Sequence, residues 1–243
     1  MCGRYSQVRS WSDLVRLYRI TVNQTPLDLP PRYNIAPTQD VPVVRSTRED
    51  GGREVALLRW GLVPFWAKDI AVGYKMINAR AETIAEKPAF RHAFRQRRCL
   101  VIADGFYEWA KTPAGRKQPY FINVASDQPF AFAGLWESWN SPDGETIQSC
   151  TIAVTQANET LQPIHDRMPA ILDAHHFDSW LDTKAPLAQA KALLRPYPDA
   201  MTICPVSDRV NAVRNDDPDC LRPIGPTVMS CHAAGLSISN TAG

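Results

Sequence analysis

Short apolar segments separated by turn-forming residues fill the middle of this 243-residue chain and predict a protein rich in β-strands. Asp50-Gly51-Gly52 and Ser141-Pro142-Asp143-Gly144 mark two of the turns, because these residue types favour the backbone angles of tight turns. The expected strands are residues 42–46, 53–62, 99–103, 107–111, 118–124, 130–136, 146–155 and 202–206.

Helical spacing of apolar residues is confined to a few short segments. In the first of them, residues 10–20, Leu14 and Leu17 lie on one face, and Ser10 or Ser12 can cap the helix. The other expected helices are residues 87–98, 175–181 and 187–194.

Antiparallel hairpins dominate this pattern and the helices occur in clusters, which predicts the α+β class. Four prolines predict an irregular loop over residues 25–40. No linker or repeat divides the chain up to Ile224, so residues 1–224 are expected to form a single domain. Small and polar residues dominate residues 225–243, which are expected to form a flexible tail.

The composition is that of an ordinary globular protein, with 44% hydrophobic and 21% charged residues. No run of about 18 apolar residues exists and charges interrupt the amino-terminal segment, so we expect neither a membrane span nor a secretory signal. The six cysteines include no Cys-x-x-Cys pair, which argues against a zinc ribbon or disulfide framework and favours the reducing cytoplasm. Because the net charge is only +2, any nucleic-acid binding must depend on a local basic patch.

Cys2 has the most distinctive chemistry, because removal of Met1 would give it a free α-amine beside its thiol. The two groups titrate near pH ~8 and ~8.5, so each is partly nucleophilic at neutral pH. The amine can condense with an aldehyde to a Schiff base, and the thiol can then close a five-membered ring on the same carbon. An internal cysteine cannot do this, since its nitrogen is an amide. The alternative is a buried apolar cysteine near a chain end.

Three further residues suit the hydrogen bonds or proton transfers of such a reaction. Asn78 can orient a ligand oxygen, or it can cap a turn. Glu108 lies between two aromatic residues, where burial would raise its pKa towards neutrality, unless it points to water from an edge strand. His165 is flanked by charged residues in a proline-bounded turn, which suits a proton shuttle or a structural histidine. The other histidines are expected to be structural or solvated: His92, His175, His176 and His232.

Two stretches have the character of nucleic-acid contacts. Within residues 90–98 three arginines, the last of them Arg98, recur at helical spacing and can neutralise phosphates, although an ordinary amphipathic helix explains them equally well. Residues 60–66 carry three aromatic side chains, which can stack on unpaired bases or pack into the core. Arg4 can hold a phosphate by a forked contact, or it can be a solvated surface arginine.

Six motifs together resemble, in order and spacing, those of the SOS response-associated peptidase (SRAP) family of abasic-site processing proteins. They are MCGR at 1–4, YNIAP at 33–37, WGLVP at 60–64, NARAE at 78–82, GFYEW at 105–109 and IHDRMP at 164–169. The likeness extends to about Ile224. It implies the SRAP fold, with a mainly antiparallel, barrel-like sheet flanked by helices.

The resemblance also implies a function. In that family the N-terminal cysteine captures the ring-opened aldehyde of an abasic site in single-stranded DNA as a thiazolidine crosslink, which implies this role for Cys2 after self-removal of Met1. By the same resemblance Asn78 would hold the opened sugar, Glu108 would assist Met1 removal and ring formation, and His165 would assist sugar opening and any lyase or reversal step.

The resemblance implies DNA contacts by phosphate-binding arginines, stacking aromatics and one pocket residue. They are Arg4, Arg80 and Arg167, then Phe65 and Trp66, and finally Thr155. No metal and no organic cofactor are implied. The expected partner is single-stranded DNA containing abasic sites, bound by a monomer in the cytoplasm in association with the nucleoid.

Two alternative functions fit part of the sequence. N-terminal-nucleophile hydrolases of the glutamine amidotransferase type also begin Met-Cys-Gly, but they offer no role for Glu108-Trp109 or His165-Asp166-Arg167. A non-covalent single-stranded DNA binder would use only Trp66 and the arginines and would leave no covalent product. A denaturing gel with abasic and intact oligonucleotides separates all three functions.

Overall fold

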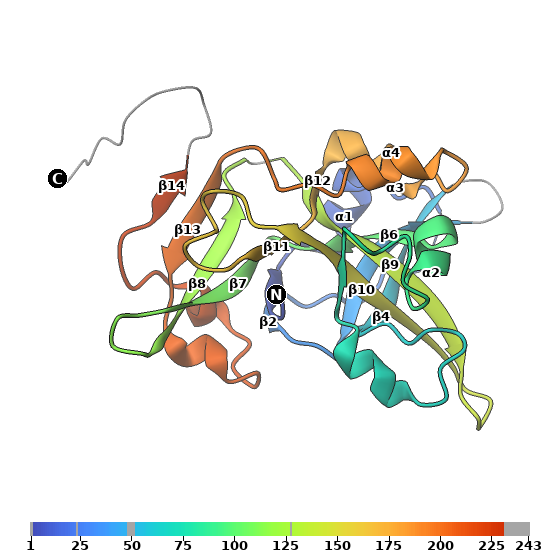
Figure 1. The fold of residues 1–243 in the computed structure, drawn as a ribbon, viewed down its shortest axis with the longest axis horizontal. Coiled ribbons are helices and arrows are strands. Elements are labelled where there is room, and N and C mark those ends of the chain that lie inside the picture. Colours follow the sequence, from blue (N-terminus) through green and yellow to red (C-terminus); the bar gives the residue numbers. More distant parts are fainter. Residues whose placement is uncertain (1, 23, 48–51, 127, 231–243) are drawn as a thin grey trace.

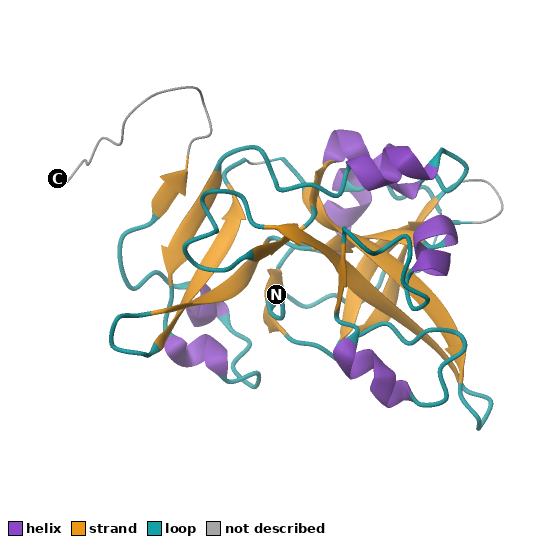
Figure 2. Ribbon diagram, viewed as in Figure 1, coloured by secondary structure: helices purple, strands orange, loops and turns teal. Residues whose placement is uncertain are grey.

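The structure, a computed structural model, describes residues 2–22, 24–47, 52–126 and 128–230. The strands of this part of the chain form two sheets, and its helices are short (Figures 1 and 2). The strands are β1 (Tyr5–Gln7), β2 (Arg32–Ile35), β3 (Asp40–Ser46), β4 (Arg53–Trp60), β5 (Asn78–Arg80), β6 (Arg98–Ile102), β7 (Gly105–Lys111), β8 (Lys117–Val124), β9 (Phe130–Asn140), β10 (Thr146–Gln156), β11 (Arg167–Pro169), β12 (Ile171–Asp173), β13 (Met201–Pro205) and β14 (Val228–Ser230). The α-helices are α1 (Trp11–Leu17), α2 (Arg91–Gln96), α3 (Phe177–Leu181) and α4 (Leu187–Ala192), and the 3-10 helices are η1 (Ile70–Lys75), η2 (Ala174–His176), η3 (Asp208–Asn211) and η4 (Pro218–Leu221).

One sheet closes into a five-stranded barrel. Its strands pair in the order β10, β4, β3, β6, β9, and β9 pairs again with β10. All these pairings are antiparallel except the short parallel contact between β10 and β4. β10 is 11 residues long and extends beyond the ring, where β5 takes the place of β4 on one edge and β11 takes the place of β9 on the other. Closure pairs the strand edges that an open sheet would expose.

The second sheet has six strands in the order β14–β13–β8–β7–β1–β2. β1 is therefore an inner strand, although it contains only three residues. Tyr5 aligns with Ile35 of β2 on one side and with Phe106 of β7 on the other. Figure 1 draws the amino terminus, which leads into this strand, near the centre of the molecule.

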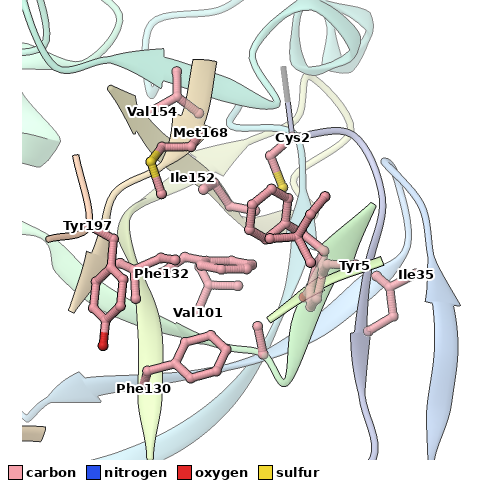
Figure 3. Packing of buried hydrophobic residues seen from close by; sticks show 14 of the residues in the cluster. Cys2, Tyr5, Ile35, Val101, Phe130, Phe132, Ile152, Val154, Met168 and Tyr197 are labelled. Atoms are coloured by element: carbon pink, nitrogen blue, oxygen red, sulfur yellow. The ribbon is translucent and has the colours of Figure 1, made fainter. Parts of the chain in front are cut away.

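A shared core fixes β1 against the barrel. The ring of Phe132, on β9, lies 5.8 Å from the ring of Tyr5 and 6.0 Å from that of Phe106, with both pairs edge to face. Figure 3 shows Cys2 and Ile152 in the same cluster. Aromatic pairs of this kind each contribute about 0.5–1.5 kcal/mol beyond area burial, so a three-residue strand is held mainly by packing.

The outer face of the barrel is covered by helices. α1 begins with the predicted Ser10 cap, which forms a reciprocal capping box with Asp13. Tyr18, which follows α1, stacks on Phe177 of α3 with ring centroids 5.3 Å apart, and its hydroxyl donates to the Phe130 carbonyl at 2.6 Å. These contacts form a second core outside the barrel.

The α+β class, the barrel-like sheet and every predicted strand are confirmed, with bounds shifted by a few residues. The irregular loop expected over 25–40 is wrong at Arg32–Ile35, which form β2. The helix expected over 87–98 is shorter, because only Arg91–Gln96 are α-helical. Val228–Ser230, part of the expected loose tail, form β14 against β13, and residues 231–243 lie outside the described residues, so a division of the chain at 224 remains a prediction. No helix in the described part has both the length and the apolar composition needed to span a bilayer.

Candidate functional site

Cys2 lies immediately before β1, and its side chain is fully buried against the shared core (Figure 3). Burial raises the pKa of its thiol well above the ordinary value, and the negative charge of Glu108 raises it further. Uncharged thiol is therefore the form favoured in the folded chain at neutral pH. The alternative of a buried cysteine is thus correct as to burial, but the charge of Glu108 beside it distinguishes this site from a purely apolar one.

Glu108 reaches Cys2 because β7 runs beside the start of the chain. The N–H of Tyr107 donates to the Arg4 carbonyl at 2.9 Å, which continues the β1–β7 pairing towards Cys2. Only 4% of Glu108 is exposed. Burial raises the pKa of its carboxyl, while the positive charge of His165 opposes this. The predicted desolvated carboxyl is confirmed, and the alternative of a solvent-facing glutamate is wrong.

A cavity of about 510 Å³ opens onto Glu108 and His165. Trp109, Lys117 and Asn211 also line it. The volume lies within the range of about 300–1,000 Å³ that is typical of small-ligand sites. Trp109 shares β7 with Glu108 and Lys117 begins β8, whereas Asn211 belongs to η3 and His165 to the connection between β10 and β11. Segments far apart in the sequence therefore form this pocket together.

His165 lies in the connection between β10 and β11, and two neighbours compete for its Nδ1. The backbone N–H of Arg167 donates to Nδ1 at 2.9 Å, and Oδ1 of Asp166 lies 2.9 Å from the same atom. The first contact requires a lone pair on Nδ1, whereas the second requires a proton there. The neutral ring therefore suits Arg167 and the protonated ring suits Asp166, which is the behaviour needed in a residue that accepts and returns a proton.

Asn78 begins β5 and aligns with Ile152 of β10. Its Nδ2 donates to the Ile77 carbonyl at 3.0 Å. Its Oδ1 is buried and has no hydrogen-bond partner among the described residues. Such an unsatisfied acceptor costs about 1–3 kcal/mol, so it suits a ligand that donates a hydrogen bond. Asn78 lies in a strand, and the turn-cap alternative is wrong.

Arg4 lies beside Trp109, which lines the cavity. Nη1 of Arg4 donates to Oδ1 of Asn34 at 2.7 Å and to the Val210 carbonyl at 2.8 Å, and its guanidinium lies 6.0 Å from the Trp109 ring. The indole N–H of Trp109 donates to Oδ1 of Asn211 at 2.7 Å. Arg4 is therefore held by protein groups, and the alternative of a solvated surface arginine is wrong.

Sequence reasoning gave no role to Asn34, Trp109, Lys117 or Asn211. The side-chain amide of Asn34 is buried and donates to the carbonyls of residues 210, 212 and 215, which fastens η3 to β2. The available signal was that Asn34, Trp109 and Asn211 belong to the segments that carry the family resemblance. Lys117 stands outside them and offered no signal.

Three predicted DNA-contact residues lie on neighbouring strands. Arg80 of β5 aligns with residue 154 of β10, Thr155 lies on β10 itself, and Arg167 of β11 aligns with residue 156. Arg80 is exposed, whereas Thr155 is buried. Arg167 forms an ion pair with Glu82, with Nη1 and Oε1 2.5 Å apart, so a phosphate bound there would compete with a carboxylate.

The aromatic residues that follow β4 divide between core and surface. Trp60 is fully buried, while 55% of Phe65 and 50% of Trp66 are exposed. Gly61 permits the turn between them: its φ is +124°, and a Cβ there would lie 2.7 Å from the Gly73 carbonyl oxygen. Of the two alternatives for these aromatic residues, packing into the core is therefore correct for Trp60 only. Phe65 and Trp66 remain available for stacking, although they do not line the cavity beside Glu108.

The predicted basic helical face is wrong at Arg98. This residue belongs to β6, and 2% of it is exposed. Its guanidinium donates to the carbonyls of Phe94 and Trp180 at 2.7 and 2.5 Å. Arg98 satisfies backbone groups at helix ends and cannot contact a phosphate.

This chain is similar to known proteins over most of its length. The sequence profile of the family described as SOS response associated peptidase (SRAP) matches residues 1–213. Abasic site processing protein YoqW of Bacillus subtilis is 40% identical over 223 residues, which cover 91% of this chain and 99% of the relative. Abasic site processing protein HMCES of Gallus gallus is 36% identical over 80% of this chain and 66% of its own length. A crystal structure of a protein from Bacteroides thetaiotaomicron matches with a TM-score of 0.82 at 28% identity, covering 91% of this chain and 99% of that one.

Proposed function

The chain belongs to the SRAP family, and on that premise we propose that it processes abasic sites in single-stranded DNA, with Cys2 bonding covalently to the opened sugar. The observation that carries the proposal is the placement of Cys2 beside the buried Glu108, whose carboxyl opens onto a cavity shared with His165. A nucleophile, a carboxyl of raised pKa and an imidazole thus lie at one site.

The first step is hydrolysis of the Met1–Cys2 peptide bond. Water adds to the Met1 carbonyl carbon, the C–N bond breaks, and Cys2 gains a free amine as methionine leaves. Glu108 is suited to take a proton from the water and return it to the leaving nitrogen, because burial brings its pKa closer to neutral pH.

The second step joins protein to DNA. The Cys2 amine attacks the aldehyde of the ring-opened sugar, and loss of water gives a Schiff base. The thiol then adds to the imine carbon, its proton passes to the nitrogen, and a thiazolidine results. One water leaves in total, and no oxidant or metal is consumed. Because burial raises the pKa of the thiol and so favours its uncharged form, Glu108 or His165 is suited to carry the thiol proton.

His165 and Asn78 are suited to prepare the sugar. Opening the ring requires a proton to leave the C1′ hydroxyl and a proton to reach the ring oxygen, and an imidazole with two competing Nδ1 partners can serve both. The unsatisfied Oδ1 of Asn78 can accept a hydrogen bond from a sugar hydroxyl.

A lyase reaction can start from the same Schiff base. If a base removes a C2′ proton before the thiol adds, the 3′ phosphate leaves and the strand is cut. Capture of the imine carbon by the thiol competes with this elimination.

Strand binding is assigned to the surface around this site. Exposed Phe65 and Trp66 can stack on bases next to the lesion, at about 1–3 kcal/mol per base. Arg80 and Arg167 on β5 and β11 can neutralise phosphates on either side of Thr155. Arg4 would add a phosphate contact through donors other than Nη1, which is already engaged.

The deciding experiment is a denaturing gel with single-stranded oligonucleotides that do or do not contain an abasic site. The unmodified chain should give a heat-stable shifted band with the abasic strand alone. Cys2→Ala should abolish that band, while Cys220→Ala, the matched control, should retain it. A Cys2→Ala protein that crosslinks normally, or crosslinking of the intact strand, would overturn the proposal.

The same samples test the alternatives. A glutamine amidotransferase-type hydrolase would release ammonia from glutamine, whereas a non-covalent binder would show only a salt-reversible complex on a native gel. Mass spectrometry of the purified chain checks the self-removal of Met1. Light scattering checks the proposed monomer.

A further inference from the structure

Asp173, His175 and His176 form a compact group of metal-ligating side chains outside the proposed reaction site. Asp173 ends β12, and the two histidines belong to η2. Their ligating atoms all lie within 4.8 Å of one another, and the imidazole centroids are 3.8 Å apart. Bonds of about 2.0–2.2 Å to a shared tetrahedral ion require ligand atoms roughly 3–3.5 Å apart. Small side-chain rotations therefore bring all three onto one ion.

A second residue holds the carboxylate in position. The hydroxyl of Tyr197 donates to Oδ1 of Asp173 at 3.0 Å. The ring of Tyr197 is 3% exposed and packs in the shared core, with its oxygen at the edge of the cluster (Figure 3). An anchored donor of this kind leaves Oδ2 of Asp173 available, and such outer-shell hydrogen bonds orient ligands in established metal sites.

The group borders a small cavity of about 80 Å³. Asp199 and Arg195 also line it, and their opposite charges roughly cancel. This volume holds an ion and one or two waters, since each water occupies about 30 Å³. No residue lining it also lines the cavity beside Glu108. The two sites are therefore chemically separate.

We propose that Asp173, His175 and His176 bind one divalent transition-metal ion of the zinc class, with the remaining coordination position open to the cavity. Two imidazoles and one carboxylate suit Zn²⁺, Ni²⁺ or Cu²⁺, whereas Mg²⁺ and Ca²⁺ prefer oxygen ligands alone. The site does not depend on the proposed DNA chemistry, and it gives a role to two histidines that the sequence had left as structural or solvated.

Isothermal titration of the full chain with Zn²⁺ tests the site. The parent chain should bind one ion in a step that the double variant His175→Ala/His176→Ala weakens at least about 100-fold, and Tyr197→Phe should weaken it about 10-fold. His92→Ala, a histidine outside the cluster, and Cys2→Ala, which removes the competing thiol, should leave the step unchanged. Thermal melting checks that each variant is folded.

Three results would overturn the proposal: no Zn²⁺ binding by the parent below about 100 µM, equal binding by the double variant, or loss of the step in Cys2→Ala. A second measurement uses the parent chain alone, so it does not depend on the folding of any variant. The electron paramagnetic resonance spectrum of the Cu²⁺-loaded chain should show two coordinated imidazole nitrogens, and a spectrum without imidazole nitrogen contradicts the site.

Discussion

The centre of the molecule and the loop after β4 place the residues of the proposed site in opposite environments. Cys2 and Glu108 are 0% and 4% exposed, whereas Phe65 and Trp66 are 55% and 50% exposed. Burial changes what the first pair can do, because it raises the pKa of both groups. The exposed aromatic rings need no such preparation, because any base offers them a flat surface. Changes at the centre should therefore alter reaction rate, and changes in the loop should alter affinity.

The largest expected effect after loss of Cys2 itself comes from Glu108→Gln. The amide keeps the shape of the side chain but cannot carry a proton, so the rate of crosslinking should fall about 10²–10⁴-fold, with strand affinity nearly unchanged. Timed crosslinking and fluorescence anisotropy measure the two quantities. Mass spectrometry should also show Met1 retained on the variant.

Glu86→Gln provides the matched control, because Glu86 is an exposed glutamate in another part of the chain. It should behave like the parent in both assays. If Glu108→Gln instead weakened binding while the rate in the bound state stayed constant, the buried carboxyl would belong to strand recognition, and the contrast between centre and loop would disappear.

Trp66→Ala should have the next largest effect. Loss of one stacked base costs about 1–3 kcal/mol, which is roughly a 5–150-fold weaker affinity for the single strand. Trp66→Phe should recover most of the affinity, because a ring of similar character remains. At saturating DNA the crosslinking rate should match that of the parent. A rate defect that persists at saturation would place Trp66 in the chemistry.

Arg80→Ala should have a smaller effect on affinity. Removing one phosphate contact to a single strand should reduce the slope of log affinity against log salt by about 0.7. Arg16→Ala serves as the control, since Arg16 lies on α1 on the outer face of the barrel, and its side chain is 72% exposed. If the slope of log affinity against log salt were the same for the parent and Arg80→Ala, Arg80 would not contact the DNA.

The smallest expected effect concerns stability, since it involves a single proton on Glu108. The folded pKa of this carboxyl lies above its unfolded value, so between the two the folded chain retains a proton that the unfolded chain has released. Stability from this group is thus present in acid and lost as pH rises through that window. Glu108→Gln should match the parent near pH 4 and exceed its free energy of unfolding at pH 7. Urea unfolding at both pH values measures this difference. An increase in the free energy of unfolding of the parent relative to the variant, as the pH rises from 4 to 7, would contradict it.

Strands made of consecutive apolar residues were predictable from the local sequence, as in residues 99–102 of β6, which are all apolar and buried. The short strands were not. β1 and β2 contain three and four residues, and their pairing joins Tyr5 to Ile35 across a 30-residue separation that no local pattern reports. Tertiary packing determines such strands, and local propensity does not.

In the candidate site, too, features set by neighbouring residues were predictable and features set by contacts distant in the sequence were not. The burial of Glu108 followed from its two aromatic neighbours, which belong to the same strand. The burial of Arg98 did not follow from its helical spacing, because its carbonyl partner at Trp180 lies 82 positions away in the chain. Asn34 was missed for the same reason, since the backbone groups that it holds lie about 180 positions further along the chain.

The strand order has a practical consequence for anyone who handles this protein. The first strand is an inner strand of its sheet, whereas the last, β14, is at the edge. Any peptide fused ahead of Cys2 extends the chain just before this inner strand, and in the proposed mechanism it replaces the reactive amine by an amide. A fusion at the carboxyl end is instead attached beyond β14, which is an edge strand. Affinity tags and fluorescent reporters therefore belong at the carboxyl end, and an amino-terminal tag should yield a folded but unreactive protein.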